Sequence, residues 1–457
     1  MNRNLFNIAI RFLTEVVTRL GSLVVFPLMA AHVGPEGYGI YTQIGTINGV
    51  LTSIATIGLG FSVVRLVTGK QNVPVTSARF WSSLMLVSAT SSALALLVIV
   101  TAPLLNFLFI KTGGAESIIR WSTPLIWCAA IGVSVGEYFR SLFRGTAYSL
   151  FQILSTIATV GGVSIVFTLG GELIDIIKIL IAIQIVQIVL MVAYLIAVGE
   201  VHVRARLMPL TEVLEMIRFG TPILIMSIST WAFASGDRLI IGAFLSTRDV
   251  GVYSAACIVA MIPSALASPF WYVLYPLMAT CKKYDDSKSL ALTCRTYSRM
   301  YFVVAIPALL GLTILSPDIV LILSSGKFVI DPLMFFIIAT ALFTDQFVAT
   351  SHYLIYLYGD PRFLRNVSIV AGLISIAMNF LLVPLLGLMG AALSMFVSYC
   401  VLEAAILQKA MSYGFDFNKL YDLGSIGRIA ISAIFMVVVV YELRGMLKLS
   451  FGFEWEL

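Results

Sequence analysis

The sequence predicts an all-α polytopic membrane protein in which two six-helix bundles form a parallel pseudo-repeat around a central cleft, with an extra C-terminal helix. Of its 457 residues, 60% are hydrophobic and only 11% are charged. Soluble domains carry about 25% charged residues, so this composition cannot cover a water-facing surface. Apolar runs of about 20 residues, long enough to cross a hydrocarbon layer of about 30 Å, recur along the chain.

The apolar runs predict thirteen membrane spans. Twelve are residues 8–33, 38–64, 80–109, 119–142, 147–169, 175–198, 219–246, 250–279, 298–323, 331–358, 366–385 and 388–410, and the thirteenth is 427–447. They divide the chain into an N-terminal bundle (1–200), a basic cytoplasmic linker (201–218), a C-terminal bundle (219–410) and a C-terminal segment (411–457). Residues 210–218 show helical spacing, which indicates either an interfacial helix or a basic loop that enforces topology.

The distribution of positive charge indicates the orientation. Lys and Arg number 29 against 23 Asp and Glu, which gives a formal net charge of +6. With the N-terminus in the cytoplasm, the loops on the opposite side hold only Lys111, Arg120, Arg248 and Lys327. Cytoplasmic loops of membrane proteins are enriched in Lys and Arg, so we expect a cytoplasmic N-terminus and no nucleic-acid partner.

Three short landmarks recur in the same order in the two halves. Gly39-Ile40-Tyr41-Thr42 recurs as Gly251-Val252-Tyr253-Ser254, at an offset of 212 residues. The other two, at an offset of 214, pair Pro103 with Pro317 and Gly145 with Gly359. This spacing predicts duplication of a six-helix unit. Six crossings return the chain to its starting side, so the two halves share an orientation, as in alternating-access carriers.

Charged residues inside the predicted spans indicate a transport site, because a charge at the bilayer centre costs about 2.5–3.5 kcal/mol on insertion scales. Arg11, Glu15 and Arg19 are spaced i, i+4 and i+8 along the first span and share one face. They form either a self-neutralising stripe near the cytoplasmic interface or an acid-bridged pair of cations at the entrance to the cleft, with Arg19 the deepest.

Two further spans carry arginines. Asp237 and Arg238 lie well inside the seventh span. Because adjacent helical residues point about 100° apart, we expect them not to pair with each other, one serving the cavity and the other a neighbouring helix. A structural interhelical ion pair is the alternative. In the fourth span, Glu137, Arg140 and Arg144 share one face, and Arg140 is the better cavity residue of the two arginines.

A carboxylate, Asp345, lies near the middle of the tenth span, beside Gln346 and two turns before His352. An isolated carboxylate at this depth is the natural place for coupling to H⁺ or Na⁺. A protonated, hydrogen-bonded Asp is the alternative. Glu403, in the twelfth span, is a weaker candidate of the same kind, and we expect no cofactor.

The charged residues together predict an anionic ligand, because guanidinium groups bind phosphate bidentately and keep their charge. The predicted substrate-binding residues are Arg11, Arg19, Arg140 and Arg238. The predicted supporting or coupling carboxylates are Glu15, Glu137, Asp237 and Asp345.

Two groups of motifs connect the chain to a known family. The first is Val33-Gly34-Pro35-Glu36-Gly37-Tyr38-Gly39-Ile40-Tyr41, followed by Ile57-Gly58-Leu59-Gly60 and Arg65. The second is Asp237-Arg238-Leu239-Ile240-Ile241-Gly242, leading to Val250-Gly251-Val252-Tyr253-Ser254. In this order and register they resemble the polysaccharide-transporter family, which contains the O-antigen and capsule flippases of the multidrug/oligosaccharidyl-lipid/polysaccharide superfamily. The resemblance covers residues 1–410.

The resemblance implies a flippase that moves an undecaprenyl-diphosphate-linked oligosaccharide, an O-antigen or capsule repeat unit, across the bacterial cytoplasmic (inner) membrane. It implies a cationic cavity between two six-helix bundles; the usual member has twelve spans, so 427–447 is a departure. The expected partners are the lipid-linked glycan, membrane lipids and polysaccharide polymerase machinery. Tyr38, Tyr41 and Tyr253 either stack on sugars or belong to interfacial aromatic belts.

Two other functions stay open on the sequence. A cation-coupled multidrug exporter of the same superfamily would use acidic residues such as Asp237 and Asp345, and the excess of intramembrane cations disfavours it. A membrane polysaccharide polymerase or ligase would need a substantial external loop, and none is predicted. The three histidines, His32, His202 and His352, lie on different connections and helices. We therefore expect no carboxylate pair, metal cluster or nucleophile motif, and no enzymatic activity.

Overall fold

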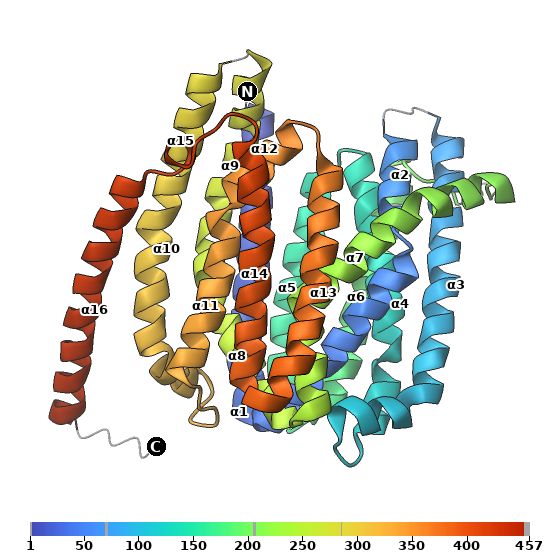
Figure 1. The fold of residues 1–457 in the computed structure, drawn as a ribbon. Helices are drawn as coiled ribbons and strands as arrows, with labels where there is room; N and C mark the ends of the chain where they lie inside the picture. The colour runs from blue at the N-terminus through green and yellow to red at the C-terminus, as the bar shows by residue number, and fades with distance from the viewer. Residues whose placement is uncertain (1, 69–71, 204–206, 285, 452–457) are drawn as a thin grey trace. The chain divides into compact units, whose positions relative to one another are not determined.

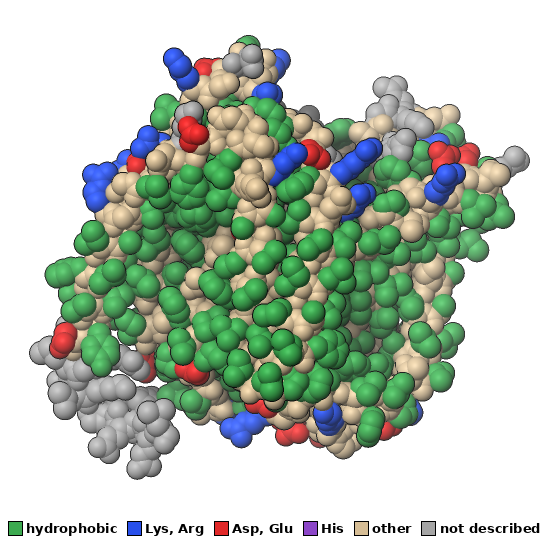
Figure 2. Space-filling model, viewed as in Figure 1, with side chains coloured by type: hydrophobic (Ala, Val, Ile, Leu, Met, Phe, Trp, Pro, Cys, Tyr) green, Lys and Arg blue, Asp and Glu red, His purple; other side chains and the backbone are tan. Residues whose placement is uncertain are grey.

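The protein is described from a computed structural model, which covers residues 2–68, 72–203, 207–284 and 286–451 (Figure 1). Over these residues all regular secondary structure is helical, which confirms the predicted all-α class. The helices form two compact units, Met1–Ser254 and Ala255–Leu457. Figure 2 shows hydrophobic side chains covering the middle of the helices, while Lys, Arg, Asp and Glu gather near the helix ends, as a membrane-spanning protein requires.

The N-terminal unit is a bundle of long helices. Its elements are α1 (Asn2–Thr56), α2 (Leu59–Val67), α3 (Val73–Leu105), the π-helix η1 (Asn106–Ile110), α4 (Ala115–Ser141), α5 (Gly145–Thr168), α6 (Leu173–Ala197), α7 (Leu210–Phe244) and the start of α8 (Thr247–Ala260). Its core contains fully buried aromatic rings from α3 and α4, with the centroids of Phe80 and Tyr138 4.5 Å apart. Helix α7 joins this unit, since the buried Ser62 hydroxyl of α2 donates to the Met216 carbonyl at 3.0 Å.

The C-terminal unit contains the remaining helices. They are α9 (Ile262–Lys283), α10 (Ser287–Leu323), α11 (Pro332–Phe347), α12 (Ala349–Leu357), α13 (Pro361–Leu386), α14 (Leu388–Met411), α15 (Phe417–Leu420) and α16 (Leu423–Phe451). Its core is again aromatic, and the Phe347 and Tyr421 rings stack with centroids 5.0 Å apart.

The helices agree with the predicted spans in most places. Eleven stretches of the described chain are long and apolar enough to cross a membrane. One of them, the 52-residue run Leu13–Val64, covers the first two predicted spans together. The eighth predicted span is divided between α8 and α9, and the tenth between α11 and α12. The thirteenth predicted span, 427–447, lies in a helix that is long enough to cross the membrane, and Leu423–Glu442 is its apolar part. Of the predicted linker 201–218, residues 204–206 lie outside the described residues.

A single glycine divides the first two predicted spans. Gly34 has φ 67° and ψ −173°, a conformation that is not helical and lies inside α1. This region of backbone space is essentially restricted to glycine, because a Cβ atom would clash with the chain. Pro35 follows and supplies no backbone N–H, so it starts the next helical segment without losing a hydrogen bond. The Gly34-Pro35 pair therefore provides the break that the span pattern predicted.

The repeated sequence motifs meet where α1 crosses α8. A Cβ atom on Gly39 would lie 1.8 Å from the Thr247 carbonyl oxygen. A Cβ atom on Gly251 would lie 2.1 Å from the Pro35 carbonyl oxygen and 3.2 Å from the Gly39 nitrogen. Glycine at both positions allows the two backbones to approach to a separation that no other residue permits.

The crossing of α1 and α8 gives a stability prediction. We expect Gly39→Ala to lower the stability of the folded protein by about 1–3 kcal/mol, the usual cost of an overpacked contact. Gly45→Ala, in the same helix segment with no atom within 4 Å of the added methyl group, is the matched control and should leave stability unchanged or raise it. Thermal unfolding of the detergent-solubilised protein measures both variants. Equal melting temperatures for the two would contradict the close approach.

An ion pair holds the start of α16 against α10. The Arg295 Nη2 atom lies 2.9 Å from Asp422 Oδ1, and the Ser425 hydroxyl donates to Asp422 Oδ2 at 2.7 Å. These hydrogen bonds, that of Arg295 first, lower the pKa of Asp422 to about 2. A lowered carboxyl pKa in the folded state means that the stabilisation is complete above the ordinary pKa of about 4 and is lost as the pH falls through about 2.

Because the ion pair depends on the charge of Asp422, the effect of Asp422→Asn on thermal stability should depend on pH. The variant should unfold at a lower temperature than the wild type at neutral pH, because it lacks the charge that pairs with Arg295. Melting temperatures recorded from pH 7 downwards should converge as the pH falls from about 4 towards the folded-state pKa of about 2. A difference that stays constant down to pH 2 would show that the charge is not what stabilises this contact.

Candidate functional site

Each described arginine of the predicted site pairs with a carboxylate of its own helix. Arg19 lies 2.8 Å from Glu15, and Arg140 lies 2.9 Å from Glu137. Arg238 lies 3.0 Å from Asp237. Arg11 lies in α1, but its side chain is outside the described residues. The three pairs are electrically neutral, so the surplus of cations that the sequence suggested is balanced locally at these positions.

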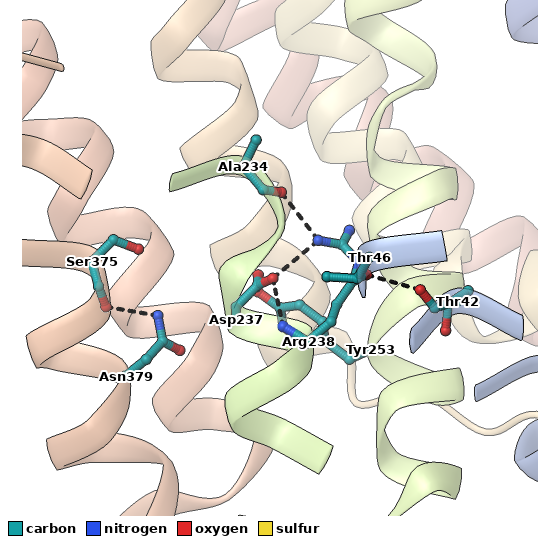
Figure 3. Close-up of polar contacts among 8 residues, drawn as sticks. All are labelled: Thr42, Thr46, Ala234, Asp237, Arg238, Tyr253, Ser375 and Asn379. Carbon is teal, nitrogen blue, oxygen red and sulfur yellow. Dashed lines mark hydrogen bonds and ion pairs between the residues drawn. The ribbon is translucent and has the colours of Figure 1, made fainter. Parts of the chain in front are cut away.

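The prediction that Asp237 and Arg238 do not pair is wrong (Figure 3). The arginine side chain is long enough to bend back along α7, where its Nη1 atom donates to the Ala234 carbonyl at 3.1 Å and to Asp237 Oδ1 at 3.0 Å. The Tyr253 hydroxyl, from α8, donates to Asp237 Oδ2 at 2.7 Å. Asp237 is only 4% exposed, and both of its carboxylate oxygens accept hydrogen bonds.

Tyr253 is therefore part of this cluster rather than of an aromatic belt. Its side chain is fully buried, and the Arg238 guanidinium lies 6.0 Å from the centre of its ring. The other polar side chains in Figure 3 are bonded within their own helices: Thr46 donates to the Thr42 carbonyl at 2.8 Å, and Asn379 to the Ser375 carbonyl at 2.8 Å.

Two adjoining cavities lie inside the N-terminal unit. One, of about 290 Å³, is lined by α4, α5 and α6, and the other, of about 310 Å³, is lined by α1, α4 and α6. Ala129, Leu180 and Gln184 line both, so the cavities meet at these residues. Their polar side chains are all uncharged: Tyr41, Asn48, Thr52, Tyr148, Gln152, Ser155, Thr159, Gln184 and Gln187.

Hydrogen bonds order one end of this neutral cavity pair. Gln152 Nε2 donates to the Tyr148 hydroxyl at 2.5 Å, and Gln187 Nε2 donates to Gln152 Oε1 at 3.2 Å. Gln184, at the junction, forms no hydrogen bond within the described chain. An amide offers two donors and two acceptor lone pairs, and a tyrosine offers a ring face and a hydroxyl. The lining suits a ligand rich in hydroxyl groups and carries nothing that selects for charge.

A second polar cluster lies in the C-terminal unit. Asp345 of α11, His352 of α12 and Glu403 of α14 each bring one ligating atom within 4.8 Å of the others. The prediction that Asp345 is isolated is therefore wrong, and Asp345 and Glu403 form a carboxylate pair that the sequence did not predict. The spacing of Asp345 and His352, seven residues apart on one helical face, was the available signal. Nothing in the sequence indicated that α14 would bring Glu403 to them.

Comparisons with known proteins agree with this architecture. The inward closed conformation of the lipid II flippase MurJ is 13% identical with a TM-score of 0.72, over 96% of this chain and 93% of that one. An inward-facing multidrug resistance MATE family transporter of the MOP superfamily is 14% identical with a TM-score of 0.68, over 86% of this chain and 95% of that one. At these identities the likeness concerns the fold.

Two sequence comparisons also find similar proteins. The chain is 21% identical to the probable low-salt glycan biosynthesis flippase Agl15 of Haloferax volcanii over 227 residues, 48% of this chain and 46% of that protein. The match thus spans about half the length of this curated relative. Residues 5–282 match the family described as polysaccharide biosynthesis protein. Because that match covers more than half of the chain, the chain belongs to the polysaccharide biosynthesis protein family.

Proposed function

We propose that the protein is a flippase that moves a lipid-linked oligosaccharide across the membrane by alternating access. In the form implied by the sequence motifs, the substrate is an O-antigen or capsule repeat unit on undecaprenyl diphosphate, and the membrane is the bacterial cytoplasmic membrane. The asymmetry of Lys and Arg between the two sets of loops supports a cytoplasmic N-terminus. Polysaccharide polymerase machinery would then consume the product.

The observation that carries the proposal is the neutral cavity pair of the N-terminal unit. Three glutamines, an asparagine and two tyrosines line it, without a charged residue in the described lining. Sugar hydroxyls are both donors and acceptors, so amides bind them without exchanging a proton or imposing a charge. A cavity for cationic drugs would instead expose a carboxylate.

In this proposal, arginines that form ion pairs with acids of their own helices bind the diphosphate. Arg140 is 52% exposed and Arg19 34% exposed on the side chain, so their ion pairs with Glu137 and Glu15 contribute little to stability. A phosphate group forms bidentate, charge-assisted hydrogen bonds with guanidinium and can replace the carboxylate as its partner. Arg238 is 17% exposed and more tightly enclosed.

A cation-coupled multidrug exporter is the second candidate function. It is favoured by one feature, the pair of carboxylates Asp345 and Glu403 inside the predicted spans of the C-terminal unit. In the N-terminal unit, Asp237 is already occupied by Arg238 and Tyr253. The two functions therefore use different units of the protein and are separable by experiment.

The test compares a strain lacking the gene with the same strain carrying it. Lipid-linked repeat units are quantified, and their reaction with an external, membrane-impermeant glycan-modifying reagent is measured in intact spheroplasts. Accumulation of unreactive units, made reactive by the restored gene, is the expected result. Unchanged lipid-linked pools with altered resistance to cationic drugs would favour the exporter. Reactive but unpolymerised units in the deletion strain would indicate a polymerase or ligase.

Arg238→Ala is expected to abolish surface glycan, because the substrate phosphate loses a cation inside the span. Protein levels in the membrane show whether the buried Asp237, left with Tyr253 as its partner, also lowers stability. Arg120→Ala is the matched control: Arg120 is 51% exposed, near the start of α4, and should tolerate the change. Surface glycan and membrane-fraction immunoblots are the measurements. Normal glycan in the Arg238 variant would remove this residue from the site.

Gln184→Leu tests the neutral cavity pair. Loss of one hydrogen bond from the amide to a sugar hydroxyl should slow the appearance of repeat units on the outer face about two- to thirteenfold, given about 0.5–1.5 kcal/mol per hydrogen bond. The rate is measured with the same external reagent in spheroplasts. Gln408→Leu, at an exposed position of α14, is the control and should match the wild type. Equal rates for the two variants would show that the sugars do not enter this cavity pair.

A further inference from the structure

Three side chains of the types that commonly bind metal ions lie close together in the C-terminal unit, outside the proposed glycan site. The imidazole Nε2 atom of His352 lies 3.1 Å and 3.3 Å from the two oxygens of Glu403. Asp345 completes the group, with one ligating atom of each residue within 4.8 Å of the others. We call these residues the Asp-His-Glu cluster.

The position of the cluster favours a bound cation. All three residues lie in helices long and apolar enough to cross the membrane, Pro332–Leu357 and Leu388–Met411. Glu403 is only 2% exposed. Over the described residues, no Lys or Arg forms an ion pair with Asp345 or Glu403, and the one cationic partner available is the imidazole itself. Two ionised carboxylates this close in a medium of low dielectric constant repel each other strongly unless a positive charge lies between them, and the alternative to a bound cation is protonation of one carboxyl group.

The charge and chemistry of the donors select the cation. A divalent ion balances both carboxylates and leaves the imidazole neutral, which is its metal-binding form. Na⁺, Mg²⁺ and Ca²⁺ prefer oxygen ligands alone, whereas one imidazole and two carboxylates suit Zn²⁺ and similar transition-metal ions. Donor atoms in a tetrahedral zinc site lie about 3.4 Å apart for ligand distances of about 2.1 Å. The ligating atoms of the cluster lie within 4.8 Å of one another, so side-chain movements of about 1.4 Å or less would bring them to that separation.

The surroundings of the cluster also fit a metal site. Asp345 Oδ2 accepts a hydrogen bond from Gln346 Nε2 at 2.6 Å, an outer contact of the kind that orients a ligating carboxylate. The hydroxyls of Ser351 and Tyr421 lie 2.9 Å apart and fix the turn of α12 that precedes His352. The break between α11 and α12 at Val348 separates the segments that carry Asp345 and His352.

We propose that Asp345, His352 and Glu403 form a binding site for a divalent transition-metal ion, with Zn²⁺ as the best match. Three protein ligands leave one tetrahedral position for water or for a group of another molecule. The site goes beyond glycan transport, and it holds or fails independently of the flippase proposal because its test measures metal binding alone.

The test uses the full-length protein in detergent micelles, freed of metal with a chelator. Co²⁺, a spectroscopic substitute for Zn²⁺, is titrated while its visible d–d absorption is recorded, and Zn²⁺ is then added as a competitor. We expect one equivalent of Co²⁺ with tetrahedral absorption, displaced by Zn²⁺. His352→Gln and Glu403→Gln should each weaken binding at least tenfold. His32→Gln, which removes a histidine of α1, is the matched control and should bind as the wild type does.

Absence of tetrahedral absorption in the wild type, or binding by His352→Gln equal to that of the wild type, would overturn the proposal. The cluster would then be a hydrogen-bonded acid–imidazole network. Since a cluster variant can fail to fold, a second measurement uses only wild-type protein: Zn²⁺ should raise its melting temperature and a chelator should reverse the rise. A melting temperature that does not respond to Zn²⁺ would also overturn the proposal.

Discussion

A polar group inside the hydrocarbon layer has no water to bind, and this constraint organises the whole molecule. Backbone groups satisfy it by forming helices throughout the spans. Side chains satisfy it by pairing, as in the ion pairs of Arg19, Arg140 and Arg238 with acids of their own helices. Such pairing is incomplete at Gln184 and in the Asp-His-Glu cluster, and these are the two places where we propose that a ligand binds.

In the N-terminal unit, helices pack with their backbones unusually close together, and the membrane environment explains this as well. Helices in lipid gain little from burying apolar side chains against each other, so packing of small residues becomes important. The Gly39–Gly251 crossing joins the two copies of the repeated motif, and Gly34 allows the chain to break between two spans without losing its helical hydrogen bonds elsewhere. The result is a bundle in which α1, α4, α5 and α6 line two half-open cavities without a charged residue in the described lining.

Periodicity and length were sufficient to predict the helices, because spans are set by the thickness of the hydrocarbon layer and not by distant contacts. The break at Gly34 and the thirteenth helical stretch followed from local signals. The sites depended on contacts between segments. The Asp237–Arg238 ion pair was missed because the prediction considered only the directions in which the two Cβ atoms point. The arginine side chain is long enough to bend back to the aspartate.

The two polar sites were hidden for a related reason. Glu403 comes to His352 across 51 residues, and Gln152 to Gln187 across 35, through helix packing that one sequence does not reveal. The glutamines of α5 and α6 carry no charge and did not stand out within the predicted spans, and only the packing of the bundle places them around one cavity. Sequence reasoning concentrated on the charged residues inside the spans and overlooked the neutral ones on which the proposed sugar recognition depends.

The central claim is that this one chain moves a glycan-bearing lipid between leaflets. Purified protein would be reconstituted into liposomes that contain a fluorescently labelled, diphosphate-linked oligosaccharide lipid, and a membrane-impermeant quencher would be added outside. We expect the label of the inner leaflet to become quenchable in vesicles with protein and to stay protected in vesicles without it. Equal protection in both, with correctly folded protein in the membrane, would contradict the account.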